Sequence, residues 1–233
     1  MTIDPLVLMT DVEEATEALL RTMAALDDAA IGAPSLLPGW TAGHVLTHLA
    51  RNADGYNRLL TWARTGVETP MYPSREARDA EIEAGAARPA AEHFADIRDA
   101  HERLADAAAA MPVEAWAFVL PPLGRSAAIV PWNRLREVAV HHVDLALDHT
   151  PEEWTDGFAL RLLREFAGDP PAGTPAMVLH PAGAEHPLVI GAADGPAVGG
   201  PSRSLAAWLI GRADGAGLTV SPDGELPRPA RWR

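Results

Sequence analysis

Two apolar segments contain histidine and glutamate residues at a spacing that suits metal ligands on helices. GHVLTHLA places His44 and His48 four residues apart, and REVAVHHVDL places Glu137 and His141 four apart. Side chains four positions apart point about 40° from each other around a helix, so each pair shares a face. Two imidazoles and a carboxylate suit Zn²⁺ or another borderline divalent ion, with a coordination position open for water or substrate. The spacing alone does not choose between His44 and His48, and each pair could instead be structural.

Composition and charge narrow the class of protein. The 233 residues are 48% hydrophobic, enough to build one large core or two smaller ones. The net charge of −13 and the absence of a basic stripe argue against nucleic-acid binding. The N-terminus lacks a cationic targeting region and no window approaches 18 apolar residues, so we expect a cytoplasmic protein without membrane contact. All 19 basic residues are arginine, which is typical of a high-GC bacterium.

The chain contains no cysteine. It therefore has no disulfide, no thiolate ligand and no cysteine nucleophile of its own. Any sulfur chemistry at the predicted metal site would have to use a thiol supplied from outside.

Hydrophobic periodicity predicts a helical first part of the chain. Helices are expected over residues 5–31, from 42 to about 64, from 75 to the AGAARP segment, over about 90–111, and from 131 or 132 to about 148. Residues 112–131 look irregular because of their prolines and glycine. The long helices suggest a four-helix bundle, in whose core facing helices can build a metal site.

The last third of the chain has a different character. The helical segment DGFALRLLREFAG is followed by short β-prone runs in AMVLHP, PLVIGA and GLTV, with a further helix over SRSLAAWLIG. We predict an α+β protein with two domains: a metal-binding bundle over residues 1–150 and a small α/β domain over residues 151–233.

Several longer segments together resemble one family. LPGWTAGHVLTHLARNADGYNRLLTWARTG, then MYPSREARDAEIE, LREVAVHHVDL and the later WLIGRADGAGL are similar to the mycothiol-dependent maleylpyruvate isomerase family. The resemblance covers essentially the whole chain and implies a DinB-like four-helix bundle at the N-terminus. It also implies that the metal is zinc, held by His48, Glu137 and His141. His44 then becomes a helix residue near the site rather than a ligand.

The same resemblance implies two functional arginines. The family's arginines in the SREARDAEIE and WLIGR segments match Arg78 and Arg212, with Arg75 the competitor for Arg78. Arginine binds carboxylates through a planar fork and stays charged. We expect Arg212 to hold the substrate or stabilise an enolate, and Arg78 to hold a second carboxylate or the thiol. We also expect the small domain to close over the metal and deliver Arg212, with substrate and thiol bound between the domains.

The implied activity is the isomerisation of maleylpyruvate to fumarylpyruvate in gentisate breakdown by actinobacteria, with zinc and mycothiol as cofactors. Two alternatives stay open: a mycothiol S-transferase, in which the thiol remains attached to an electrophile, and a non-enzymatic metal-binding module. The retained arginines argue against the module. We expect a monomer that binds a small-molecule substrate and a low-molecular-weight thiol.

Other polar and aromatic residues allow simpler interpretations. Asp144 lies seven residues beyond Glu137, so it could orient a ligand or could be a solvated acid. Trp40 and Trp132 are expected to be packing anchors at helix starts. His142 is expected to point away from the face that carries the ligands. The histidines without a partner at ligand spacing are expected to be structural or exposed; these are His93, His101, His149, His180 and His186.

Overall fold

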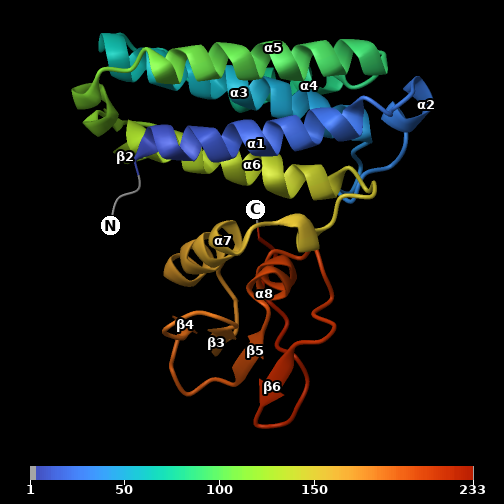
Figure 1. Ribbon diagram of the computed structural model, residues 1–233, viewed down its shortest axis with the longest axis vertical. Helices are drawn as coiled ribbons and strands as arrows, with labels where there is room; N and C mark the ends of the chain where they lie inside the picture. The colour runs from blue at the N-terminus through green and yellow to red at the C-terminus, as the bar shows by residue number, and fades with distance from the viewer. Residues whose placement is uncertain (1–3, 233) are drawn as a thin grey trace. The chain divides into compact units, whose positions relative to one another are not determined.

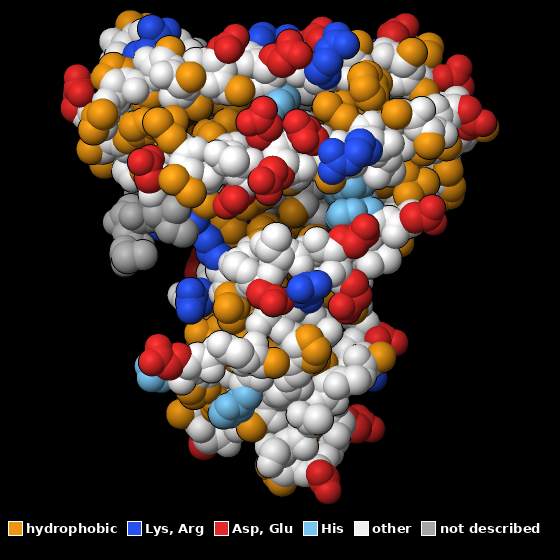
Figure 2. Space-filling model, viewed as in Figure 1, with side chains coloured by type: hydrophobic (Ala, Val, Ile, Leu, Met, Phe, Trp, Pro, Cys, Tyr) orange, Lys and Arg blue, Asp and Glu red, His pale blue; other side chains and the backbone are white. Residues whose placement is uncertain are grey.

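The computed structural model describes residues 4–232 and divides the chain into two compact units, Met1–Leu147 and Asp148–Arg233. The first unit is almost entirely helical, and the second combines helices with short strands (Figure 1). This composition confirms the predicted α+β class. Acidic side chains are spread over the face drawn in Figure 2, with basic ones interspersed among them, in keeping with the net charge of −13. None of the described helices is long and apolar enough to cross a membrane.

Four helices form the core of the first unit: α1 (Pro5–Met23), α3 (Ala42–Thr65), α5 (Ala90–Ala109) and α6 (Val130–Asp144). Helix α3 packs against α5 and α6, and α1 packs against the same two helices, which closes a four-helix bundle (Figure 1). The shorter α4 (Arg75–Gly85) lies against α3. Apolar side chains between the helices are fully buried, as the helical periodicity of the sequence requires.

The approach of α4 to α3 depends on two glycines. A Cβ atom on Gly43 would lie 1.9 Å from the backbone oxygen of Ala86, and one on Gly85 would lie 2.6 Å from the Cγ2 atom of Thr47. Neither position can hold a larger residue without a shift of the backbone or of its neighbour. These contacts fix α4, and the side chains it carries, against the helix that presents His48.

Shorter elements complete the first unit: α2 (Asp28–Ile31), η1 (Val113–Ala117), η2 (Ala127–Ile129) and the antiparallel pair β1 (Val119–Leu120) and β2 (Arg125–Ser126). Two expected helix bounds were wrong. The helix expected over residues 5–31 is interrupted after Met23, because Asp27 caps a separate short helix. Helix α6 ends at Asp144 rather than near residue 148, and Ala146 adopts a left-handed φ of 59°.

The second unit contains η3 (Pro151–Glu153), α7 (Asp156–Gly168), α8 (Ser202–Leu209) and a four-stranded sheet. The strands are β3 (Met177–Pro181), β4 (Leu188–Ile190), β5 (Ala197–Gly200) and β6 (Thr219–Ser221). Their order is β4-β3-β5-β6, with β3 and β5 parallel and the other pairs antiparallel. Strand β5 was not predicted, because its AVGG sequence ends in two glycines, which disfavour strands.

Candidate metal centre

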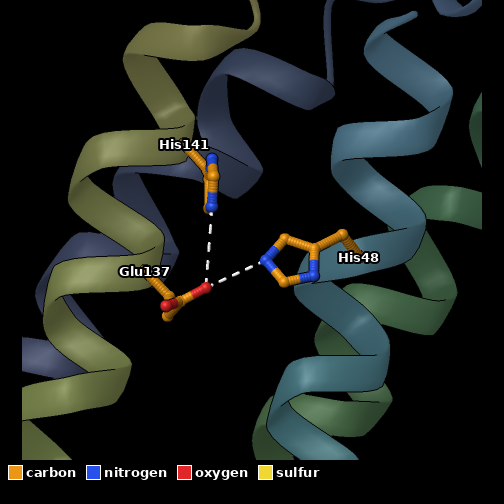
Figure 3. Close-up of side chains that lie close together, drawn as sticks. All are labelled: His48, Glu137 and His141. Carbon is orange, nitrogen blue, oxygen red and sulfur yellow. Dashed lines mark hydrogen bonds and ion pairs between the residues drawn. The ribbon is translucent and has the colours of Figure 1, made fainter. Parts of the chain in front are cut away.

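Three of the predicted site residues meet between α3 and α6. His48 projects from α3, and Glu137 and His141 project from α6 (Figure 3). One potential ligand atom from each lies within 4.8 Å of the others, and this is the only such group found among residues 4–232. The Oε2 atom of Glu137 is 2.9 Å from Nε2 of His48 and 3.6 Å from Nε2 of His141. The spacing of four residues therefore places both α6 side chains on the face that meets α3.

Helix packing shields this cluster from solvent. The side chain of His48 is 7% exposed, and those of His141 and Glu137 are 17% and 20% exposed. The rings of His48 and His141 meet edge to face, with their centroids 4.8 Å apart. The ring of Trp40 packs beside that of His48, with their centroids 5.8 Å apart, so this tryptophan is a packing anchor that also borders the cluster.

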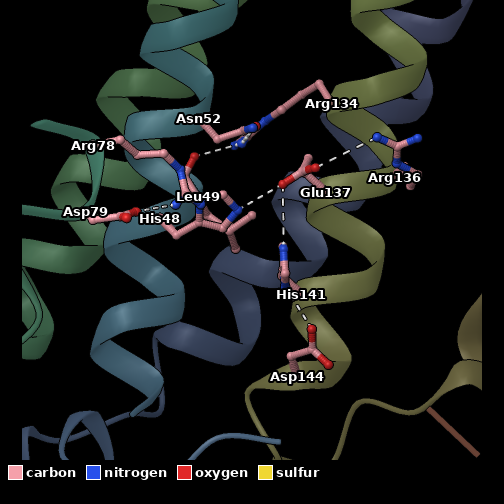
Figure 4. Close-up of polar contacts among 10 residues, drawn as sticks. All are labelled: His48, Leu49, Asn52, Arg78, Asp79, Arg134, Arg136, Glu137, His141 and Asp144. Carbon is pink, nitrogen blue, oxygen red and sulfur yellow. Dashed lines mark hydrogen bonds and ion pairs between the residues drawn. The ribbon is translucent and has the colours of Figure 1, made fainter. Parts of the chain in front are cut away.

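Asp144 orients one of the residues of the cluster. Its Oδ2 atom lies 2.8 Å from Nδ1 of His141, and its side chain is fully buried (Figure 4). This bond leaves Nε2 of His141 directed toward Glu137. A carboxylate on the far nitrogen of a ligating histidine fixes the ring and its tautomer. The structure thus favours the first of the two interpretations of Asp144.

Arg78, rather than Arg75, lies beside the cluster. An Nη2 atom of Arg78 lies 3.1 Å from Nδ1 of His48, and its Nη1 atom donates to Asp79 at 2.7 Å. The same guanidinium lies 5.9 Å from the ring centroid of Tyr72. The side chain of Arg75 is 89% exposed, and its Nε atom lies 3.9 Å from Oδ2 of Asp79.

His44 is held away from the cluster by the start of its own helix. Its Nδ1 atom accepts hydrogen bonds from the backbone N–H and the hydroxyl of Thr41 at 3.1 and 2.8 Å. Its Nε2 atom lies 3.2 Å from Oε2 of Glu83 on α4. His44 therefore completes a capping box at the start of α3 and links that helix to α4. His142 likewise points elsewhere and pairs with Thr22 on α1 at 2.8 Å.

The charges of the cluster are strongly coupled. Burial lowers the pKa of His48. Burial raises the pKa of Glu137, but its hydrogen bonds with His141 and His48 outweigh this effect and hold that pKa well below the ordinary value. Burial also opposes a charge on His141, yet its bonds to Asp144 and Glu137 raise its pKa to about 9. The metal-free cluster is therefore a carboxylate between one neutral and one protonated imidazole.

Comparison with known proteins assigns the chain to a family. Residues 12–146 match the family model described as the mycothiol maleylpyruvate isomerase N-terminal domain. The chain belongs to this family. The crystal structure of the mycothiol-dependent maleylpyruvate isomerase, and that of a histidine-to-alanine mutant of it, are each 31% identical to the chain with a TM-score of 0.89. Each match covers 99% of this chain and 98% of the other. No curated protein matches the chain.

A further arginine of this family member escaped the sequence analysis. Arg134 on α6 is fully buried, and its Nη1 atom donates to the backbone oxygen of Leu49 at 2.7 Å and to Oδ1 of Asn52 at 2.9 Å. The signal was its position one turn before Glu137, on the same side of α6. The sequence does not indicate its burial, because arginine is rarely fully buried.

Arg212 belongs to the second unit. It follows α8, and its Nη1 atom donates to the backbone oxygen of Ile210 at 2.8 Å. Its predicted role in the reaction stays a prediction. The histidines expected to be structural or exposed also lie outside the cluster: His93 is buried, His101 is partly buried, His149 pairs with Glu153, and His180 and His186 are exposed.

Proposed function

We propose that the chain is a zinc- and mycothiol-dependent cis–trans isomerase that converts maleylpyruvate to fumarylpyruvate. The cluster of His48, Glu137 and His141 carries this proposal. The likeness of the whole chain to a solved mycothiol-dependent maleylpyruvate isomerase supports the choice of reaction. The absence of cysteine supports an external thiol as the nucleophile.

The residues of the cluster fit zinc. Two imidazole nitrogens and a carboxylate oxygen, all within 4.8 Å of one another, form a donor set typical of zinc sites that keep one position open. The Asp144–His141 pair is the kind of outer contact that holds a ligating histidine in place. When bound, zinc would supply a site for the thiol sulfur and favour its thiolate form at neutral pH.

The proposed chemistry requires a temporary nucleophile. The thiolate sulfur adds to one carbon of the cis double bond, and the electron pair of that bond moves onto the conjugated carbonyl oxygen as an enolate. Rotation about the resulting single bond follows. When the enolate reforms the double bond in the trans geometry and expels the thiolate, the thiol is regenerated.

Arg78 and Arg212 are proposed to hold the anionic parts of the reactants. Arg78 already lies beside His48, where its fork could bind a carboxylate of the substrate or of the thiol. Arg212 is proposed to bind the substrate or the enolate oxygen. Replacing Arg78 with lysine should impair turnover more than Arg75→Lys, the matched change at an exposed site. Full turnover and unchanged substrate affinity in Arg212→Ala would remove that residue from the proposal.

The deciding experiment is a paired assay on zinc-loaded protein. Maleylpyruvate turnover is followed by absorbance with a catalytic amount of mycothiol, and free thiol is counted at the end. We expect rapid isomerisation with the thiol conserved. His48→Ala should abolish both stoichiometric zinc binding and turnover, whereas His186→Ala, at an exposed histidine, should change neither.

Other outcomes point to different functions. Tight zinc binding without maleylpyruvate turnover would refute the isomerase. Loss of one free thiol for each electrophile consumed would instead identify a mycothiol S-transferase at the same site. Turnover that persists without zinc would refute the role of the metal.

A further inference from the structure

Arg134 is a buried cation between the two helices that carry the metal cluster. Its exposed fraction is 0%, and its only hydrogen bonds to residues that the structure describes go to the Leu49 carbonyl and the Asn52 side chain (Figure 4). Within those residues it makes no ion pair. A buried charge is costly unless it is paired, so Arg134 requires a compensating charge nearby.

Glu137 supplies the main compensating charge. Burial lowers the pKa of Arg134 to about 10, and Glu137 exerts the largest of the attractions that oppose this effect. Arg134 therefore stays charged at neutral pH. The neighbouring phenols cannot balance it, because burial raises the pKa values of Tyr56 and Tyr72 and keeps both neutral.

A bound divalent metal would be neutralised by the same negative charge on Glu137. The carboxylates of Glu137 and Asp144 together balance a dication, so less of the Glu137 charge then remains to compensate Arg134. Arg136 lies 4.0 Å from Glu137, but its side chain is 20% exposed, so water can screen it. Arg78 is paired with Asp79. The fully buried Arg134 is thus the main unscreened positive charge beside the loaded centre.

We propose that Arg134 is a specificity-determining residue, which makes the loaded metal centre bind an anionic external ligand, such as a thiolate, in preference to a neutral one. The inference rests on the proposed metal binding by His48, Glu137 and His141. Arg134 acts through its charge and touches neither the metal nor the reactants. In the proposed reaction this charge favours the ionised form of the thiol over water.

Cobalt-loaded protein allows a direct test, because the visible spectrum of Co²⁺ reports ligand exchange. Azide serves as the anionic probe, imidazole as the neutral probe, and 2-mercaptoethanol as a simple thiol. In Arg134→Met and Arg134→Gln, azide and thiol affinity should fall on the order of tenfold, because the attraction of one buried charge is only partly screened at an effective dielectric of about 20. Imidazole affinity should not change. Arg134→Lys keeps the positive charge but replaces the planar guanidinium with an ammonium group, so it should retain azide binding.

The controls separate charge from packing. Arg98→Met removes an exposed arginine charge and should alter no affinity. Equal losses of azide and imidazole binding in all three Arg134 variants would make Arg134 a structural brace and overturn the inference, as would unchanged azide affinity in the neutral variants. If the neutral variants do not fold, the wild-type preference decides: a ratio of azide to imidazole affinity no higher than that of free Co²⁺ would overturn the inference. Failure of the wild-type protein to bind Co²⁺ would instead refute the metal centre itself.

Discussion

Zinc binding should displace one proton from His141, and this can be measured. In the metal-free cluster Glu137 is already ionised and His48 is neutral, whereas the pKa of His141 is raised to about 9. Zinc requires the neutral imidazole. At pH 6.5 nearly every His141 carries a proton that zinc must remove, at a cost of about 3 kcal/mol, since a tenfold change in proton affinity is worth about 1.4 kcal/mol.

The sign of the pH dependence follows from this competition. Because the His141 pKa is raised, the proton is fully bound below neutrality and zinc affinity should increase as pH rises toward 9. Calorimetry at pH 6.5 in buffers of different ionisation enthalpy should give one proton released for each zinc bound. Working at that pH keeps a zinc-bound water, whose pKa is about 7 in catalytic sites, from contributing most of the signal.

Asp144→Asn provides the matched variant. It removes the charge whose hydrogen bond raises the His141 pKa, so a smaller share of His141 should be protonated at pH 6.5 and proton release should fall. The variant also weakens the support of the ligand ring, a change that typically costs about 10–100-fold in metal affinity. Release of no proton by the wild-type protein, or the same release by Asp144→Asn, would refute the coupling between the two residues.

Three further perturbations test the scaffold around the site. Burial and the Arg134 charge lower the pKa of His101 to about 4. The neutral His101 therefore contributes stability that is fully present above its ordinary pKa of 6.5 and is lost as pH falls toward 4. In His101→Leu, the free energy of unfolding measured in urea should depend less on pH over this range. Gly43→Ala should lower the free energy of unfolding by about 2 kcal/mol or more, because its Cβ would overlap the Ala86 carbonyl; an unchanged thermal melt would contradict this packing. His44→Ala should cost about 1 kcal/mol through loss of the capping box and leave zinc stoichiometry intact, and a lost zinc ion would make His44 a ligand after all.

The sequence could predict the part of the candidate metal site that depends on one helix. A spacing of four residues places Glu137 and His141 on one face wherever a helix forms, and the apolar pattern predicts that helix. The choice between His44 and His48 requires knowledge of how α3 is rotated about its own axis, and this rotation depends on the contacts of α3 with α4 and α6. A local signal was nevertheless present: Thr41 lies three residues before His44, which is the spacing of a capping box.

The electrostatic environment of the cluster was much less predictable than its ligands. Asp144 and Arg134 lie close to the α6 ligands in sequence, but one orients His141 and the other reaches α3, and only the packed bundle shows which contacts each makes. The pairing of Glu137 and His141 therefore follows from local geometry, whereas the charge around the candidate site depends on which neighbours are buried without an ion pair. In our proposal, that charge decides whether a metal bound by the same three residues favours a thiolate or water. Proteins that share the His48–Glu137–His141 pattern could thus differ in chemistry through residues as inconspicuous in sequence as Arg134.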